Sequence, residues 1–409
     1  NERWANEALR VLAVATARID EGESWREHGL TWLGLVGMTD PLREGMPEVI
    51  EGMHQAGIRT VMITGDQSAT AYAVAKELNL SGDEPLRILD STQMDQLPEN
   101  ARDALAQETH VFARVSPGDK LEIVQTLQRS GQVVAMTGDG INDGPALKAA
   151  DVGVAMGGAG QDVARSLSDV VLEDDQLSTM QNAVAQGRTI YTNIRKALQF
   201  LLSTNFSEIE VMLAAFALGL APPLNPMQLL WVNLITDVFP GLALALEAPE
   251  PDVMQRPPRD PKEPIIRGSD LKSMALESGV ITAGTLASYG WGLARYGVGT
   301  RASGLAFNTL TTAQLLHALL CRSENAGLYK AGREPNRYLD AALAASLAAQ
   351  AGTVLLPPVR KLLGVGPIGL IDLPVIAVGT LGPLLVNDWL KRRRVGKKTE
   401  LTEPPEQEN

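Results

Sequence analysis

Asp139, Asn142 and Asp143 are residues whose types and spacing point directly to chemistry. Glycines flank them, and the apolar run 133–136 comes just before. A buried strand that ends in a glycine turn presents such side chains at the rim of a parallel sheet, where α/β proteins bind phosphate ligands. Their oxygens suit Mg²⁺, whereas no His or Cys lies nearby to favour Zn²⁺. The pattern predicts a site for magnesium and phosphate. The alternative is a plain turn that uses Asp, Asn and Gly for backbone reasons.

A second set of candidates lies inside long apolar segments. Asn205 and Glu208 are three residues apart and share a helix face, and Asn233, Thr236 and Asp237 make a second oxygen-rich face. Polar groups inside a membrane are costly, so each is a functional candidate. Two carboxylates, two amides and a hydroxyl predict a site for a hard cation. The alternative is hydrogen bonding between helices without ion binding.

The residues before about 177 alternate short apolar runs with helix-like segments. This βαβ spacing predicts an α/β domain with a doubly wound parallel sheet, whose carboxyl edge carries both Thr64 and Thr137. The expected helices are 68–78, 118–130 and 143–150. The expected strands are 31–36, 58–63, 110–114, 133–136, 152–156 and 169–172.

From about residue 177 the pattern is helical, and six segments have roughly the length that spans a membrane. A stalk helix is expected to run into the first of them, and Pro226 and Pro240 are expected to loosen the second. The basic run 391–394 follows the last span, which predicts that both ends of the bundle are cytoplasmic. The expected spans are 197–220, 226–246, 271–293, 305–321, 339–359 and 370–390.

The composition limits the possible functions. The net charge is −12 and no basic face recurs, so no nucleic acid partner is expected. The single Cys321 allows no internal disulfide. No signal peptide is expected in residues 1–25, and the polar tail 397–409 is predicted to be disordered.

The run Gly138-Asp139-Gly140-Ile141-Asn142-Asp143-Gly144-Pro145 resembles the hinge motif of P-type ATPases, the cation pumps that pass through an aspartyl-phosphate. Three further runs resemble motifs of this family and occur in its order: Asp40-Pro41-Leu42-Arg43, Thr64-Gly65-Asp66, and Arg114-Val115-Ser116-Pro117-Gly118-Asp119-Lys120. The runs 229–237 and 256–264 are similar to the calcium-pump-like branch.

The resemblance implies a role for each matching residue in the soluble part. Asp139 would hold Mg²⁺, while Asn142 and Asp143 would order the phosphate and the metal shell. Thr64 and Gly65 would bind phosphoryl oxygens, and Lys120 would neutralise developing charge.

The resemblance also implies nucleotide-side roles. Asp66 would anchor its loop or contact ATP. Asp40 and Arg43 would be hinge and nucleotide-side residues. Arg114 would also bind the nucleotide.

The membrane candidates match the family's transport ligands on its fifth and sixth helices. Gln314 falls where sarcoplasmic-type calcium pumps carry a glutamate, so it is a further candidate that lacks the charge. His317 and Glu210 are not expected to be ligands. The transported cation implied by the resemblance is Ca²⁺, and the bilayer is that of a bacterial plasma membrane.

The sequence departs from the family because it contains no Asp-Lys-Thr-Gly-Thr run, which carries the phosphorylated aspartate. The chain is therefore expected to be the C-terminal part of a pump, inactive without a missing N-terminal part. The resemblance implies four regions: 1–36, the tail of a nucleotide-binding domain; 37–176, an incomplete haloacid-dehalogenase-like phosphorylation domain; 177–396, the stalk and six-helix transmembrane bundle; and the tail 397–409.

Two other functions stay open. One is a haloacid-dehalogenase-type phosphohydrolase, which shares the motifs 64–66 and 138–143. The other is a non-enzymatic membrane component that binds cations or a partner chain.

Overall fold

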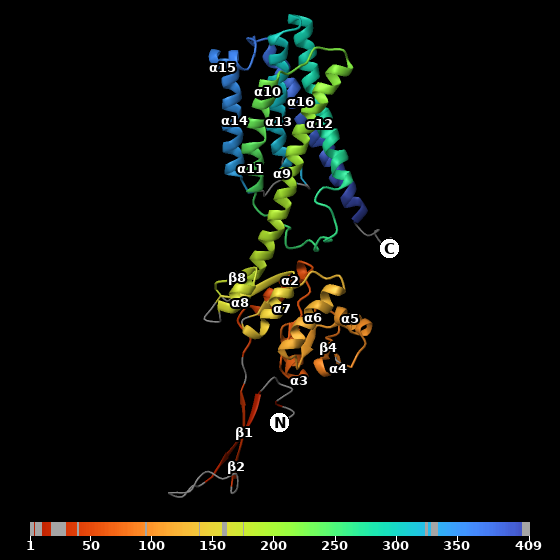
Figure 1. Cartoon of the computed structure of the whole chain (residues 1–409), viewed down its shortest axis with the longest axis vertical. Helices are drawn as coiled ribbons and strands as arrows, with labels where there is room; N and C mark the ends of the chain where they lie inside the picture. Colours follow the sequence, from red (N-terminus) through yellow and green to blue (C-terminus); the bar gives the residue numbers. More distant parts are fainter. Residues whose placement is uncertain are drawn as a thin grey trace, which may run out of the picture. The chain divides into compact units, whose positions relative to one another are not determined.

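The structure is a computed structural model, and it consists of two units (Figure 1). Unit 1 comprises Asn1–Ala185 and Asp252–Pro261, and unit 2 comprises Gln186–Pro251 and Lys262–Asn409. The structure describes residues 4, 10–17, 30–38, 41–94, 96–138, 140–157, 162–174, 176–323, 326–328 and 334–402.

Two three-stranded parallel sheets form the α/β part of unit 1. Their orders are β3-β5-β4 and β6-β7-β8. The parallel pairing was predicted correctly, but the single sheet was wrong: within the described residues, β3 and β6 each pair on one side only. The strands are β3 (Met62–Ile63), β4 (Ile88–Asp90), β5 (Val111–Ala113), β6 (Ala135–Gly138), β7 (Val152–Met156) and β8 (Val170–Leu172).

Helices pack against these sheets through a continuous apolar core. Ile63 of β3 and Val134 contact the buried clusters of both sheets, so the two sheets share one interior. Ser116 and Asp119 form a capping box at the start of α6, which satisfies free N–H groups at that helix end. The helices are α2 (Met46–Gln55), α3 (Ser68–Glu77), α4 (Ser91–Met94), α5 (Glu99–Glu108), α6 (Pro117–Arg129), α7 (Gly144–Ala149) and α8 (Asp162–Leu167), with a short 3₁₀ turn at Ile141–Asp143.

The expected strand 31–36 does not belong to a parallel sheet. It forms β2 (Thr31–Met38), which pairs antiparallel with β1 (Arg10–Thr16). The prediction was wrong because a short apolar run has no periodicity that separates a buried parallel strand from a paired ribbon. Apolar side chains of this ribbon are exposed: Trp32 and Leu33 are each 61% accessible.

Helices make up unit 2 (Figure 1). Four segments of the described chain are long and apolar enough to cross a membrane: Leu177–Ala217, Pro226–Ala245, Arg337–Leu355 and Asp372–Val395. The helices are α9 (Leu177–Ala217), α10 (Pro226–Thr236), α11 (Val238–Ala245), α12 (Gly268–Tyr296), α13 (Thr300–Cys321), α14 (Arg337–Leu355), α15 (Pro357–Leu362) and α16 (Asp372–Thr402).

The six expected spans all fall on helices, but the count of six is not established. α12 and α13 have 29 and 22 residues, enough for a bilayer, yet they are less apolar than the other four segments. Many residues of α13 are buried, including Asn308, Thr311 and Gln314. A helix buried among other helices can carry such polar groups because it meets protein, not lipid. The helix α16 also continues into the expected disordered tail as far as Thr402.

The second expected span is broken at its polar residues. α10 ends at Thr236 and α11 begins at Val238, with Asp237 between them. Pro240 cannot donate a backbone hydrogen bond to the Thr236 carbonyl four residues earlier, which favours the break. Pro226 does not loosen the helix, because it occupies the first turn after the N-cap Asn225, where proline is well tolerated.

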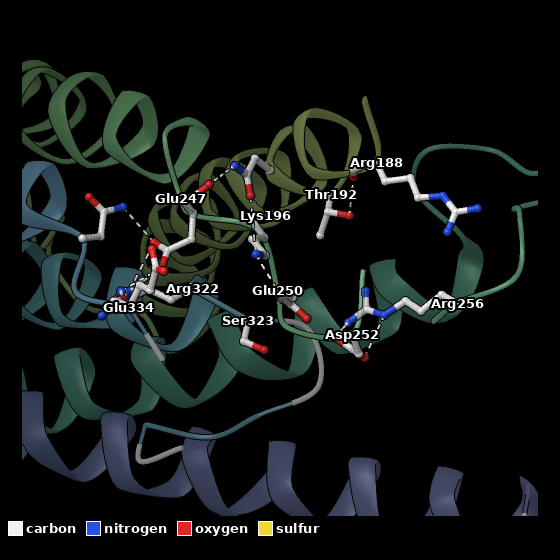
Figure 2. A network of polar contacts seen from close by, with 12 residues as sticks. Arg188, Thr192, Lys196, Glu247, Glu250, Asp252, Arg256, Arg322, Ser323 and Glu334 are labelled. Atoms are coloured by element: carbon white, nitrogen blue, oxygen red, sulfur yellow. Dashed lines mark hydrogen bonds and ion pairs between the residues drawn. The ribbon is translucent and has the colours of Figure 1, made fainter. Parts of the chain in front are cut away.

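A buried polar network ties α9, the segment after α11, α13 and α14 together (Figure 2). Lys196 is 1% exposed, and its ammonium lies 3.0 Å from Glu250. The Arg322 guanidinium lies 2.7 Å from Glu247, which is 5% exposed. The Asn336 amide donates to the same carboxylate at 2.8 Å. Both ion pairs, Lys196 with Glu250 and Arg322 with Glu247, are therefore largely shielded from solvent.

Arg322→Ala is expected to destabilise unit 2 strongly. It leaves the Glu247 carboxylate buried without its cation, a change that typically costs about 3–5 kcal/mol. Thermal unfolding in detergent micelles measures the effect. Arg337→Ala is the matched control, because Arg337 is exposed at the start of α14. Equal midpoints for the two variants would contradict a stabilising role for the pair.

Candidate functional sites

The Thr64 loop follows β3 and is fixed to the loop that follows β5. The Thr64 N–H donates to Phe112 at 2.9 Å, and the Thr64 carbonyl accepts from Val115 at 3.0 Å. The Thr64 hydroxyl donates to the Asp66 carboxylate at 2.9 Å. Thr64 is half-buried, whereas Gly65 and Asp66 are exposed. The loop thus exposes Gly65 and the Asp66 carboxylate to solvent beside the end of the sheet.

Arg114 adopts a positive φ of 56°, which is unusual for a residue other than glycine. Its N–H donates to the Asp66 carbonyl at 2.9 Å, and its carbonyl accepts from the Ser91 hydroxyl at 2.7 Å. Its Nε lies 4.0 Å from Asp90. The Thr92 hydroxyl donates to Asp90 and holds the pKa of that carboxyl below its usual range. These contacts hold the strained backbone in place and keep a carboxylate beside the exposed guanidinium.

Lys120 and Asp143 meet across 23 residues of sequence. The Lys120 ammonium lies 2.5 Å from Asp143 Oδ1, and the Asp143 side chain is 7% exposed. A Cβ atom on Gly138 would lie 2.6 Å from the Asp143 Cβ, so the turn after β6 needs glycine to admit this carboxylate. Asn142 is exposed beside it. One charge pair therefore joins the motif that ends at Lys120 to the hinge-like motif that contains Asp143.

Three further residues were predicted for this part of the site. Arg43 is exposed before α2. Asp40 and Asp139 lie outside the described residues, so their roles stay predictions.

In unit 2, Asp237 accepts hydrogen bonds from a residue of each predicted helix face, the face of Asn205 and Glu208 and the face of Asn233 and Thr236. The Asn205 amide donates to Oδ2 at 3.2 Å, and the Thr236 hydroxyl donates to Oδ1 at 3.1 Å. The Thr204 hydroxyl also reaches Oδ1 at 3.4 Å. The break between α10 and α11 therefore places a carboxylate directly against α9.

Gln314 brings α13 to the same place. Its amide donates to the Thr204 carbonyl and the Ser207 hydroxyl, each at 3.0 Å, and reaches Glu208 at 3.4 Å. Thr204 thus links the two carboxylates: its carbonyl accepts from Gln314, which reaches Glu208, and its hydroxyl donates to Asp237. Sequence reasoning missed Thr204 and Ser207. Thr204 lies four residues before Glu208, and this spacing could have placed it on the same helix face.

Two amide oxygens of the predicted ligands have no hydrogen-bond partner among the described residues: Asn233 Oδ1 and Gln314 Oε1. Both atoms are buried, and a buried acceptor without a partner costs free energy. A cation is one ligand that would satisfy such oxygens. Among the described residues, no group of three or more His, Cys, Asp or Glu side chains could hold a metal ion. Any cation here would therefore be bound by two carboxylates together with amides, hydroxyls and carbonyls.

Comparison with known proteins gives two family matches. Residues 1–151 match the haloacid dehalogenase-like hydrolases, and residues 221–393 match the C-terminus of cation transporting ATPases. A haloacid dehalogenase-like region followed by the C-terminal region of a cation-transporting ATPase is the organisation expected of a P-type cation pump. The chain belongs to the P-type cation-transporting ATPases, and within them it is similar to the calcium pumps.

The similar proteins are mostly named for calcium transport. Calcium-transporting ATPase 1 of Bacillus cereus is 40% identical over 406 residues, which cover 95% of this chain and 46% of that protein. The calcium-transporting ATPase of Bacillus subtilis is 42% identical over 88% of this chain and 41% of that protein. Calcium-transporting ATPase type 2C member 2 of Rattus norvegicus is 34% identical over 94% of this chain and 40% of that protein. The chain spans less than half the length of these relatives.

Proposed function

We propose that this chain is the C-terminal part of an ATP-driven pump that works through an aspartyl-phosphate and transports Ca²⁺ across a membrane. The observation that carries the proposal is the oxygen cluster of unit 2, where Gln314 reaches the buried Glu208 at 3.4 Å and Thr204 links this pair to Asp237. Among the described residues, the buried amide oxygen of Gln314 has no hydrogen-bond partner. Ca²⁺ takes six to eight oxygen ligands, and the cluster offers ligands of this kind. The calcium-transporting relatives support the same choice of ion.

The proposed cation site uses both carboxylates. Glu208 and Asp237 would supply the negative charge, while Asn205, Asn233, Thr236 and Gln314 would supply neutral oxygens. Asn205 and Thr236 currently donate hydrogen bonds to Asp237, so they hold its carboxylate in position.

In unit 1, the Lys120–Asp143 pair would face the phosphoryl group. The donor set fits Mg²⁺, because Asp143, Asn142 and Asp139 offer only carboxylate and amide groups. When bound, Mg²⁺ would neutralise phosphate charge. Lys120 would add a fixed positive charge at the same edge, and Thr64 and Gly65 would bind phosphoryl oxygens through hydroxyl and N–H. Asp66, Arg43, Asp40 and Arg114 would lie toward ATP.

Two features of unit 1 support a longer protein. The ribbon of β1 and β2 exposes Trp32 and Leu33, and a two-stranded ribbon is marginally stable alone. A preceding nucleotide-binding domain would cover these side chains. Among the described residues, β3 and β6 are edge strands, and each could accept another parallel strand whose end would lie near the loops of Thr64 and Asn142. Such a segment would supply the missing aspartate.

The chain alone is expected to form no phosphoenzyme. It has no Asp-Lys-Thr-Gly-Thr run, and fixed charges cannot replace the nucleophile of a covalent mechanism. Purified chain incubated with γ-labelled ATP should give no acid-stable label. A labelled band that hydroxylamine removes would contradict this prediction. Its appearance would favour a phosphohydrolase that uses another carboxylate.

The protein is an integral membrane protein, given its apolar helices and its membrane ATPase relatives. We propose a bacterial plasma membrane with unit 1 and the C-terminus in the cytoplasm. The exposed arginines Arg392 and Arg393 near the C-terminal end of the last candidate span support this orientation.

A further inference from the structure

The exposed face of α16 carries a stripe of side chains whose type changes along the helix axis. Val378, Leu381, Leu385 and Trp389 follow one another at spacings of three or four residues, and they are 49–72% exposed. Residues at this spacing lie on one face of a helix. The next position on the stripe is Arg393, which is also exposed. The stripe thus passes from aliphatic to aromatic to cationic side chains.

Two of the four basic residues at 391–394 point into the bundle. The Lys391 ammonium, on a side chain that is 8% exposed, donates to the carbonyl oxygens of Leu320 and Ser323 at the end of α13. The Arg394 guanidinium donates to the buried Glu277 carboxylate at 3.1 Å. These two charges are used within the protein, where they fasten α16 to α13 and α12.

The other two basic residues face outward. The Arg392 side chain is 54% exposed and lies 2.8 Å from Asp388, which neutralises much of its charge. The Arg393 guanidinium lies 3.9 Å from the centre of the Trp389 ring. No carboxylate pairs with Arg393 among the described residues. Arg393 is therefore the outward cation whose charge is least compensated.

We propose that Arg393 and Trp389 bind the phosphate headgroup of an anionic phospholipid at the membrane surface. Tryptophan side chains concentrate at the level of lipid headgroups, so Trp389 marks where the apolar stripe leaves the hydrocarbon. An arginine one turn further reaches the phosphate layer, and its planar guanidinium matches two phosphate oxygens. Stacking on the indole holds the guanidinium ready for that contact.

The test uses the 409-residue chain in vesicles that contain phosphatidylcholine and phosphatidylglycerol, one of which carries bromine in its acyl chains to quench nearby tryptophan. The fluorescence of Trp389 is obtained as the difference between the wild type and Trp389→Phe. Brominated phosphatidylglycerol is expected to quench Trp389 more than brominated phosphatidylcholine at the same mole fraction. The expected preference is about fivefold, since anionic surfaces attract a nearby arginine by that order. Inorganic phosphate should not compete.

Arg393→Gln should abolish the preference while quenching by phosphatidylcholine stays unchanged. Lys361→Gln is the matched control: Lys361 is exposed on α15, which lies at the other end of the bundle from the C-terminal part of α16 (Figure 1). It removes the same charge and should keep the preference. Phosphorus analysis of lipid that copurifies from mixed micelles gives a second measurement, independent of fluorescence. Equal quenching by the two lipids in the wild type, or a preference that survives Arg393→Gln, would overturn the proposal.

Discussion

Asp237→Asn and Glu208→Gln are each expected to abolish activation by Ca²⁺, at the concentrations that activate the wild type, in a full-length pump that contains this chain. Each substitution removes one of two negative charges from the oxygen cluster at nearly constant volume. The affinity of oxygen sites for Ca²⁺ varies over several decades with ligand charge, so the half-activating concentration should rise by roughly 100-fold or more. The measurement is Ca²⁺-dependent phosphorylation by labelled ATP.

The neighbouring carboxylate provides a matched control. Glu210 lies on the same helix as Glu208, but its oxygens accept from Ser278 at 2.8 Å and Thr282 at 3.1 Å, both on α12. Glu210→Gln should therefore keep Ca²⁺ activation. Phosphorylation by inorganic phosphate without Ca²⁺ should survive in all three variants, because unit 1 is unchanged. Normal Ca²⁺ activation in both cluster variants would mean that the membrane site lies elsewhere.

Lys120→Gln is expected to slow phosphorylation of the full-length pump by about 10²–10³-fold, the usual loss when one preorganised electrostatic contact is removed. The change removes the cation 2.5 Å from Asp143 and leaves this buried carboxylate without its partner. The substitution should not alter the Ca²⁺ concentration that gives half-activation, because the cation site is in unit 2. Rapid-quench measurement of phosphoenzyme formation gives the rate.

Lys148→Gln is the control for Lys120→Gln. Lys148 is exposed on α7 in the same unit, so its loss changes the net charge equally without touching the pair. Its variant should phosphorylate at the wild-type rate. If both lysine variants are equally fast, Lys120 has no role in phosphoryl transfer.

The sequence predicted the family correctly, because short motifs carry it, while the roles of the site residues stay predictions. Lys120 and Asp143 were both named from their motifs, and the similar proteins confirm the family. Their contact was not predictable, since 23 residues separate them and only packing of α6 against the turn after β6 brings them together. Polar residues in apolar helices were equally visible in the sequence, because each is costly there.

Other features depended on tertiary contacts. The sequence did not distinguish Thr204 and Ser207 from other hydroxyl residues. Their role in the cluster follows from the contacts of Gln314 on α13 with both residues. The basic run 391–394 was used only to predict the orientation of the bundle. The inward contacts of Lys391 with carbonyl oxygens and of Arg394 with a carboxylate of other helices became visible only in the structure. The strand at 31–36 was misplaced because its apolar run fits more than one kind of pairing.

Uptake of radioactive calcium into membrane vesicles tests the central claim most directly. The full-length pump that contains this chain is expressed, and inside-out vesicles receive Mg²⁺ and ATP. The account predicts ATP-dependent accumulation of calcium that stops with Asp237→Asn and continues with Glu210→Gln. No ATP-dependent accumulation in the wild type, or undiminished accumulation with Asp237→Asn, would contradict it.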